Sequence, residues 1–69
     1  MKYRDFVPIL ERYGFVLVRT KGSHRQYQAV INGRTMLVTV DCSQLGEDIK
    51  TNNLASMIRQ SGLPKKLFR

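Results

Sequence analysis

Residues 23–40 read Ser-His-Arg-Gln-Tyr-Gln-Ala-Val-Ile-Asn-Gly-Arg-Thr-Met-Leu-Val-Thr-Val, and this stretch decides the fold. The Asn32-Gly33 pair between two β-rich runs is the strongest short-range signal of a two-residue hairpin. It predicts strands over residues 23–31 and 35–40, with Ile31 opposite Arg34. Because side chains alternate between the faces of a sheet, one face meets the core and the other meets water. The core face receives Tyr27, Ala29, Met36, Val38 and Val40, and the other face receives His24, Gln26, Gln28, Thr35, Thr39 and Asp41.

A further strand precedes this hairpin. Residues 15–20, Phe-Val-Leu-Val-Arg-Thr, are of the β-branched and aromatic types that favour strands. We expect a two-residue loop at Lys21-Gly22 to join them to the next strand, which sets Arg19 opposite His24 at cross-strand contact distance. The three strands then form an antiparallel meander.

A short helix is expected before the strands. Asp5 is the predicted N-cap, and Pro8 then falls at the third helical position, where no intrahelical hydrogen bond is lost. Gly14 ends the helix in the left-handed conformation, and Phe15 packs back over the last turn. Helical spacing places one group of apolar side chains on one side: Phe6, Val7, Ile9, Leu10 and Tyr13.

A second helix follows a polar connection. Thr51 or Asn52 is its predicted cap and Gly62 its end, with Leu54, Met57 and Ile58 facing inward. The order α-β-β-β-α, with both helices on one face of a three-stranded antiparallel sheet, predicts an α+β fold. We expect a single domain over residues 1–63 and a mobile basic tail over residues 64–69.

Composition limits the class of protein. The chain has 69 residues, with 12 Lys and Arg against five Asp and Glu, and a net charge of +7. This length builds one small core, and this charge favours a polyanion or an acidic protein as partner. Cys42 is the only cysteine, so no intramolecular disulfide forms, which suits a reducing compartment. Without an apolar run for a signal peptide or a membrane span, we expect a cytoplasmic protein and no membrane partner.

His24, the only histidine, lies between Lys21 and Arg25. An imidazole accepts and donates protons near neutrality because its unperturbed pKa is ~6.5, and lysine and arginine hold phosphates. The stretch therefore suggests acid–base chemistry on a nucleic-acid backbone, with an ordinary surface histidine as the alternative. One histidine without a cysteine or acidic cluster cannot supply a metal shell, so we expect no metal and no other cofactor.

Three segments, in order, resemble the HicA toxins of bacterial type II toxin–antitoxin systems. They are the first helix running into residues 14–19 (Gly-Phe-Val-Leu-Val-Arg), the Gly-Ser-His motif within residues 21–27, and a closing helix over residues 54–63 (Leu-Ala-Ser-Met-Ile-Arg-Gln-Ser-Gly-Leu). The resemblance covers about residues 2–63. It implies a double-stranded-RNA-binding-domain-like fold and an mRNA-cleaving enzyme. It also implies that His24 is catalytic and that a HicB-type antitoxin covers it.

We therefore expect a toxin endoribonuclease that cleaves mRNA without metal and uses one essential histidine for proton transfer. The candidate RNA-binding residues are Arg19, Lys21, Gly22, Ser23, Arg25 and Arg59. The cations are phosphate clamps that also stabilise charge in the transition state, and the turn residues offer backbone N–H and hydroxyl contacts. Arg59 adds affinity for RNA or meets an acidic antitoxin.

Two other functions stay open. Members of the family often carry a second histidine just after the third strand, where this chain has Asp41-Cys42. That difference favours a non-catalytic RNA-binding module of the same fold as the alternative. A small interaction domain whose charge serves only an acidic protein is the third candidate, and salt-dependent RNA binding separates it from the second.

Overall fold

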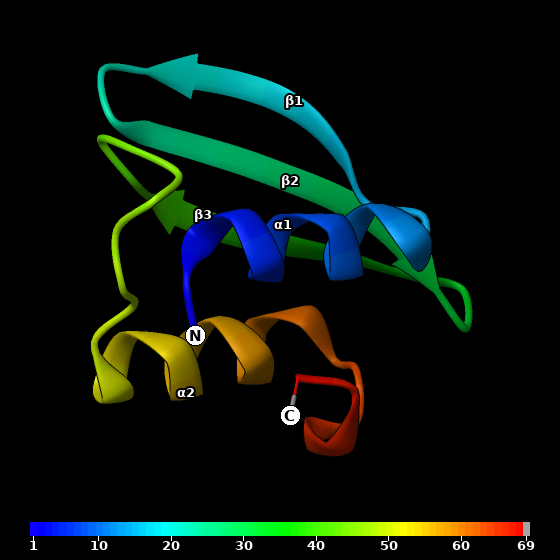
Figure 1. Ribbon diagram of the computed structural model, residues 1–69. Coiled ribbons are helices and arrows are strands. Elements are labelled where there is room, and N and C mark those ends of the chain that lie inside the picture. Colours follow the sequence, from blue (N-terminus) through cyan, green and yellow to red (C-terminus); the bar gives the residue numbers. More distant parts are fainter. Residues whose placement is uncertain (69) are drawn as a thin grey trace.

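The computed structural model describes residues 1–68 and contains one three-stranded sheet with two helices on the same side of it (Figure 1). The elements are α1 (Tyr3–Arg12), β1 (Val16–Lys21), β2 (His24–Ile31), β3 (Arg34–Asp41), α2 (Thr51–Ser61) and the 3-10 helix η1 (Lys65–Phe68). The strands are antiparallel, in the order β1-β2-β3. The predicted α-β-β-β-α fold is therefore confirmed.

The hairpin of β2 and β3 has the predicted register. Ile31 pairs with Arg34, and the ladder continues without interruption to the pair His24 and Asp41. Asn32 and Gly33 both have positive φ angles, of 51° and 79°, as a type I′ turn requires. The residues predicted for the core face are buried or packed against the core. We call the opposite side of the sheet, which carries His24 and Gln28, the open face.

The hairpin of β1 and β2 differs from the prediction. Its loop is Gly22-Ser23, so Lys21 and not Arg19 pairs with His24, and Arg19 pairs with Gln26. Gly22 has a φ of 60° while Ser23 does not take a positive φ, the pattern of a type II′ turn with glycine first. All of β1 is exposed, so burial places little constraint on its register, and a bulge lies between Leu17 and Arg19.

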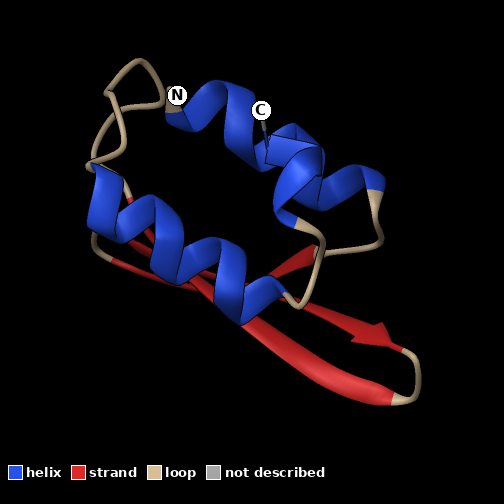
Figure 2. Ribbon diagram, turned by 90° about the horizontal axis from the view of Figure 1, so that it is seen from below, coloured by secondary structure: helices blue, strands red, loops and turns tan. Residues whose placement is uncertain are grey.

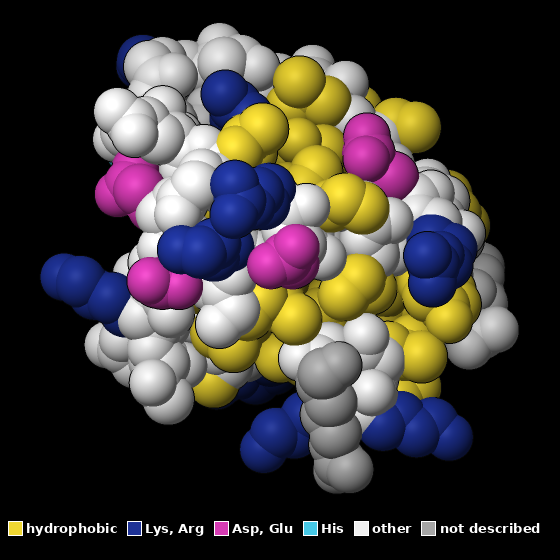
Figure 3. Space-filling model, viewed as in Figure 1, with side chains coloured by type: hydrophobic (Ala, Val, Ile, Leu, Met, Phe, Trp, Pro, Cys, Tyr) yellow, Lys and Arg dark blue, Asp and Glu magenta, His cyan; other side chains and the backbone are white. Residues whose placement is uncertain are grey.

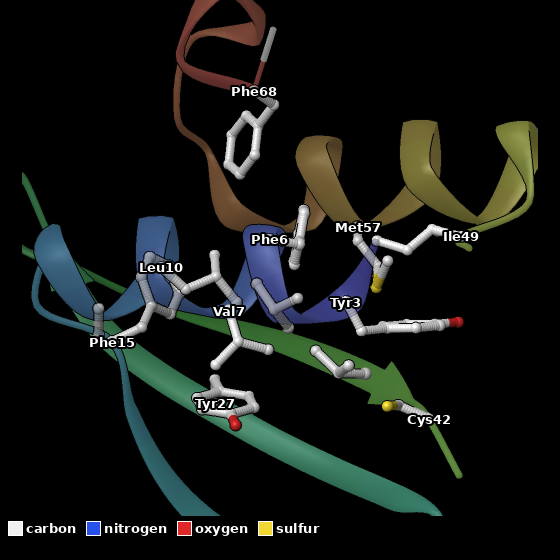
Figure 4. Close-up of a cluster of buried hydrophobic side chains, with 13 residues drawn as sticks. Tyr3, Phe6, Val7, Leu10, Phe15, Tyr27, Cys42, Ile49, Met57 and Phe68 are labelled. Atoms are coloured by element: carbon white, nitrogen blue, oxygen red, sulfur yellow. The ribbon is translucent and has the colours of Figure 1, made fainter. Parts of the chain in front are cut away.

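The core lies between α1 and the sheet (Figure 4). Phe6 and Leu10 of α1 meet Val38 and Val40 of β3, and all four side chains are fully buried. Figure 2 shows α1 on one side of the strands and α2 beside β3 on that same side. Met57 brings α2 into the core. Because the helices cover only this side, the open face stays accessible.

Helix α1 begins earlier than predicted. Lys2, not Asp5, is its N-cap, and no side chain caps it. The loop before α2 does so instead, because the Glu47 and Leu45 carbonyls accept the N–H groups of Tyr3 and Arg4 at 3.1 and 2.9 Å. Pro8, which lies inside the helix, is therefore at the sixth helical position and costs one backbone hydrogen bond.

The end of α1 agrees with the prediction. Gly14 has a φ of 92°, its N–H donates to the Glu11 carbonyl, and the Phe15 N–H donates to the Leu10 carbonyl. These two bonds make a Schellman motif. Phe15 is buried and returns to the core beside Leu10, so the chain enters β1 in a fixed direction.

Helix α2 runs beside β3, one of the two edge strands. Lys50 is its N-cap, so neither Thr51 nor Asn52 caps it, while Gly62 ends it in the left-handed conformation as predicted. The Thr39 N–H donates to the Gln60 side-chain oxygen at 3.1 Å. This bond satisfies a backbone donor at the sheet edge and ties the helix to it.

The segment after Pro64 is not the mobile tail that was expected. Phe68, at the end of η1, is buried, and its ring stacks on Phe6 with 5.0 Å between centroids and 25° between planes. Burial of an aromatic ring anchors this end of the chain, while Lys65 and Lys66 remain exposed. Arg69, the last residue of the predicted tail, lies outside the described residues.

Candidate functional site

His24 is the first residue of β2 and lies on the open face, between Lys21 of β1 and Asp41 of β3. Directly opposite residues on one face of a sheet are in contact range. Within residues 1–68, no side-chain hydrogen bond involves the imidazole of His24. Both of its ring nitrogens are therefore open to a ligand. Figure 3, which views the molecule from the α1 side, shows no histidine, as expected for a residue of the opposite face.

One hollow beside His24 is positively charged. It has a volume of about 240 Å³ and is lined by Arg19, Lys21, His24, Gln26 and Thr39, and we call it the cationic hollow. The ion pair found within residues 1–68 joins Lys2 to Asp48, with 3.5 Å between Nζ and Oδ1, and includes neither Arg19 nor Lys21. Neither cation of the hollow is therefore neutralised by a carboxylate of the described chain, and both are available to a phosphate.

A second hollow lies on the other side of His24, between the end of β3 and α2. Its volume is about 250 Å³, and it shares His24 and Thr39 with the cationic hollow. Its other walls are Tyr3, Asp41, Asn53, Ser56, Met57 and Gln60. Because these walls carry amide and hydroxyl groups and no Lys or Arg of the described chain, we call it the polar hollow. His24 is thus part of the wall between a site with two cations and a site that has one carboxylate and no cation of the described chain.

The family model for the HicA toxin of bacterial toxin–antitoxin systems matches residues 3–63. The chain belongs to the HicA toxin family. It is therefore the toxin of a toxin–antitoxin system, and an antitoxin is its partner. No curated protein matches the chain.

In this HicA toxin the Gly22-Ser23 turn is tied to the end of β3. The Ser23 hydroxyl donates to Asp41 Oδ1 at 2.6 Å, and the Ser23 carbonyl accepts the Cys42 N–H at 2.9 Å. A hydroxyl has one proton to donate, so Ser23 keeps only acceptor capacity for a ligand while this bond persists. The bonds instead fix the position of His24, the next residue.

Two predicted RNA-binding residues lie apart from both hollows. Arg25 points to the core face, where it is half-buried between Thr20 and Val40, as its position in β2 predicts. Arg59 lies on another side of α2, in a separate hollow of about 440 Å³ with Ile58 and Lys65. The structure thus brings Arg19, Lys21, Gly22 and Ser23 together around His24, and places Arg25 and Arg59 elsewhere.

Burial shifts two ionisable groups near the site. It raises the pKa of the Cys42 thiol, and Glu47 and Asp41 add to that effect while Arg25 opposes it. Burial likewise raises the pKa of the Tyr3 phenol, with smaller additions from Cys42, Asp41 and Glu47. Both groups are thus neutral near pH 7. A thiol in this state is a poor nucleophile.

Within residues 1–68 no three His, Cys, Asp or Glu side chains gather closely enough to hold a metal ion. No helix in the same range is long and apolar enough to cross a membrane.

Sequence reasoning missed the polar hollow. Asn53, Ser56, Met57 and Gln60 follow the spacing i, i+3, i+4, i+7, which places them on one stripe of α2. The polar members of that stripe could have been noticed in the sequence. What the sequence could not show is that α2 lies beside β3, which turns the stripe toward His24.

Proposed function

We propose that this HicA toxin is an endoribonuclease that cleaves mRNA in the cytoplasm, with His24 as its essential proton-transfer group. The observation that carries the proposal is the position of His24 in the wall shared by the two hollows, beside Arg19 and Lys21, which form no ion pair within residues 1–68. A phosphate in the cationic hollow would lie next to an imidazole that has no protein partner.

The ribose 2′-hydroxyl supplies the nucleophile for such a reaction. Removal of its proton lets the oxygen attack the adjacent phosphorus, and protonation of the departing 5′-oxygen completes the break. The expected products are a 2′,3′-cyclic phosphate and a 5′-hydroxyl. General acid–base catalysis by one side chain accelerates a reaction by about 10²- to 10⁴-fold. One histidine performs one of the two proton transfers at a time, so water or a neighbouring group performs the other.

Arg19 and Lys21 serve the phosphate. Their charges hold its oxygens and stabilise the additional negative charge of the transition state. Because both side chains are exposed, we expect RNA affinity to fall with rising salt. This chemistry needs no metal ion, since the nucleophile belongs to the substrate and the cations belong to the protein.

The antitoxin is proposed to be of the HicB type and to cover the open face. Three apolar side chains of that face, Val16, Val30 and Leu37, are 59%, 67% and 42% exposed. They lie on the same face as His24, at the other end of the sheet. An acidic partner that contacts both ends would bury these side chains and neutralise part of the net charge of +7.

A non-catalytic RNA-binding module is the second candidate function. The observation that favours it is Asp41, which pairs with His24 from β3, so the residue opposite the imidazole is a carboxylate rather than another histidine. The module would use the same cationic hollow for phosphates and show the same dependence on salt, but it would leave RNA intact.

The deciding experiment incubates purified protein with mRNA and a chelator, for the wild type, His24→Ala and Gln28→Ala. Gln28 is a matched control because it belongs to the open face of β2 but lines neither hollow. We expect the rate of RNA cleavage to fall by at least ~100-fold in His24→Ala and to change little in Gln28→Ala. Undiminished cleavage by His24→Ala would disprove the assignment. Binding without cleavage by the wild type would favour the non-catalytic module.

A further inference from the structure

The polar hollow has no role in the chemistry described so far, although it contacts the same histidine. Its walls carry one carboxylate, Asp41, and no Lys or Arg of the described chain. A phosphate in this hollow would meet that carboxylate without a compensating cation. The phosphate therefore belongs in the cationic hollow, and the polar hollow suits a neutral group next to it.

Two hydrogen-bonding side chains of the polar hollow, Gln60 and Ser56, are already held in position. The side-chain oxygen of Gln60 accepts the Thr39 N–H at 3.1 Å, and its amide nitrogen donates to the Ser56 hydroxyl at 3.3 Å. Ser56 therefore has its own proton free to donate. Asn53 lies one turn earlier. Its backbone N–H donates to the side-chain oxygen of Asn52, but its own side-chain amide takes part in no hydrogen bond within residues 1–68. Preorganised donors and acceptors reduce the cost of binding.

The hollow also offers apolar surface. Met57 and Tyr3 both line it and belong to the core, with only 4% and 6% of their surface exposed, so the core continues up to this hollow. Apolar side chains combined with a few fixed polar groups are the pattern of small-molecule sites. A nucleobase needs both, because its face stacks and its edge forms hydrogen bonds.

We propose that the polar hollow binds the unpaired base of the nucleotide that carries the scissile phosphate. This inference rests on the proposed function and adds a base subsite to it. Asp41 uses one oxygen for the Ser23 hydroxyl, so the other is free to accept an N–H from the ligand. A carboxylate accepts well from an exocyclic amino group, as on cytosine, whereas uracil has carbonyl oxygens there. The site therefore favours bases with an amino group over uracil.

The first test uses binding alone. The ¹⁵N-labelled protein is titrated with cytidine 3′-monophosphate, uridine 3′-monophosphate and inorganic phosphate. We expect all three to shift the amide resonance of Lys21, and the cytidine nucleotide to shift Asn53, Ser56 and Gln60 as well. The proposal fails if the cytidine nucleotide leaves α2 unshifted, or if inorganic phosphate shifts α2 equally.

Two variants make the test specific. Asn53→Ala removes one hydrogen bond to the base. It should therefore weaken the binding of the cytidine nucleotide about 5-fold and leave the binding of inorganic phosphate unchanged. Asn52→Ala is the matched control, because Asn52 neighbours Asn53 but does not line the hollow. Asp41→Asn can still accept from Ser23 and can donate to uracil, so it should reduce the preference for cytidine over uridine several-fold. An unchanged preference would contradict the role of Asp41.

The outcomes separate this inference from the proposed function. If the wild type binds the cytidine nucleotide at α2 but does not cleave RNA, the catalytic proposal fails and the base subsite stands. If it cleaves RNA while Asn53→Ala and Asp41→Asn change neither nucleotide binding nor the base found at the cleavage sites, the subsite fails alone.

Discussion

The two hairpins of the sheet differ in what determines their register. In the hairpin of β2 and β3, Tyr27 pairs with Val38 and Arg25 with Val40, so a shift by one residue would expose buried side chains. In the hairpin of β1 and β2 every residue of β1 is exposed, and its pairing is interrupted by a bulge. The first hairpin is held by the core, and the second by its turn and backbone hydrogen bonds.

Because β1 contributes no buried side chain, it is free to carry residues that face a ligand. A strand that contributes nothing to the core can direct its polar side chains toward a ligand, and β1 supplies both cations of the cationic hollow. The exposed edge of such a strand invites pairing with other chains, which charged side chains discourage. Arg19 and Lys21 are thus placed to protect the edge as well as to bind phosphate.

The largest expected difference between the hairpins concerns stability. Val38 of β3 is fully buried, whereas Val18 of β1 is 50% exposed. We expect Val38→Ala to lower the free energy of unfolding by about 2 kcal/mol, from lost burial and the cavity left behind. Val18→Ala should change it by less than about 0.5 kcal/mol. Urea unfolding of both variants measures this, and equal losses would mean that β1 contributes to the core after all.

The next prediction compares two cations at matching positions. Lys21 pairs with His24 beside the Gly22-Ser23 turn, and Arg34 pairs with Ile31 beside the other turn. Lys21→Ala should slow cleavage about 10-fold at low salt, because one charge-assisted contact to the phosphate is lost. Arg34→Ala should leave the rate within about 2-fold. Equal effects of both variants in an RNA cleavage assay would indicate that only total charge matters.

The same contrast explains what the sequence could predict. Asn32-Gly33 and the alternating side chains beside it specify one hairpin completely, because local turn preference and burial agree there. For the other hairpin, Lys21-Gly22 and Gly22-Ser23 are both possible loops, and a strand that is apolar on both faces does not decide between them. The prediction that His24 lies on the open face is confirmed, but its partner from β1 was predicted two residues too early, at Arg19 instead of Lys21.

The remaining errors also have physical causes. Asp5 was a reasonable N-cap by residue type, but backbone carbonyls 45 and 47 from a distant loop cap α1 instead. Phe68 gave no local signal, and its burial depends on Phe6, which lies 62 positions earlier in the sequence. Such contacts become visible only when the chain is folded, as does the polar hollow between β3 and α2.

The smallest expected effects come from the two turn glycines. Gly22 and Gly33 have φ angles of 60° and 79°, which cost an alanine about 1 kcal/mol each. A Cβ at either position would have no atom within 4 Å, so both variants should lose a similar free energy of unfolding. This loss should lower the melting temperature by about 4–8 °C. Only Gly22→Ala should also slow RNA cleavage, because a strained Gly22-Ser23 turn displaces Lys21 from His24. Melting curves and cleavage rates of the two variants decide the matter: equal rates would mean that the geometry of the first turn is irrelevant to the site.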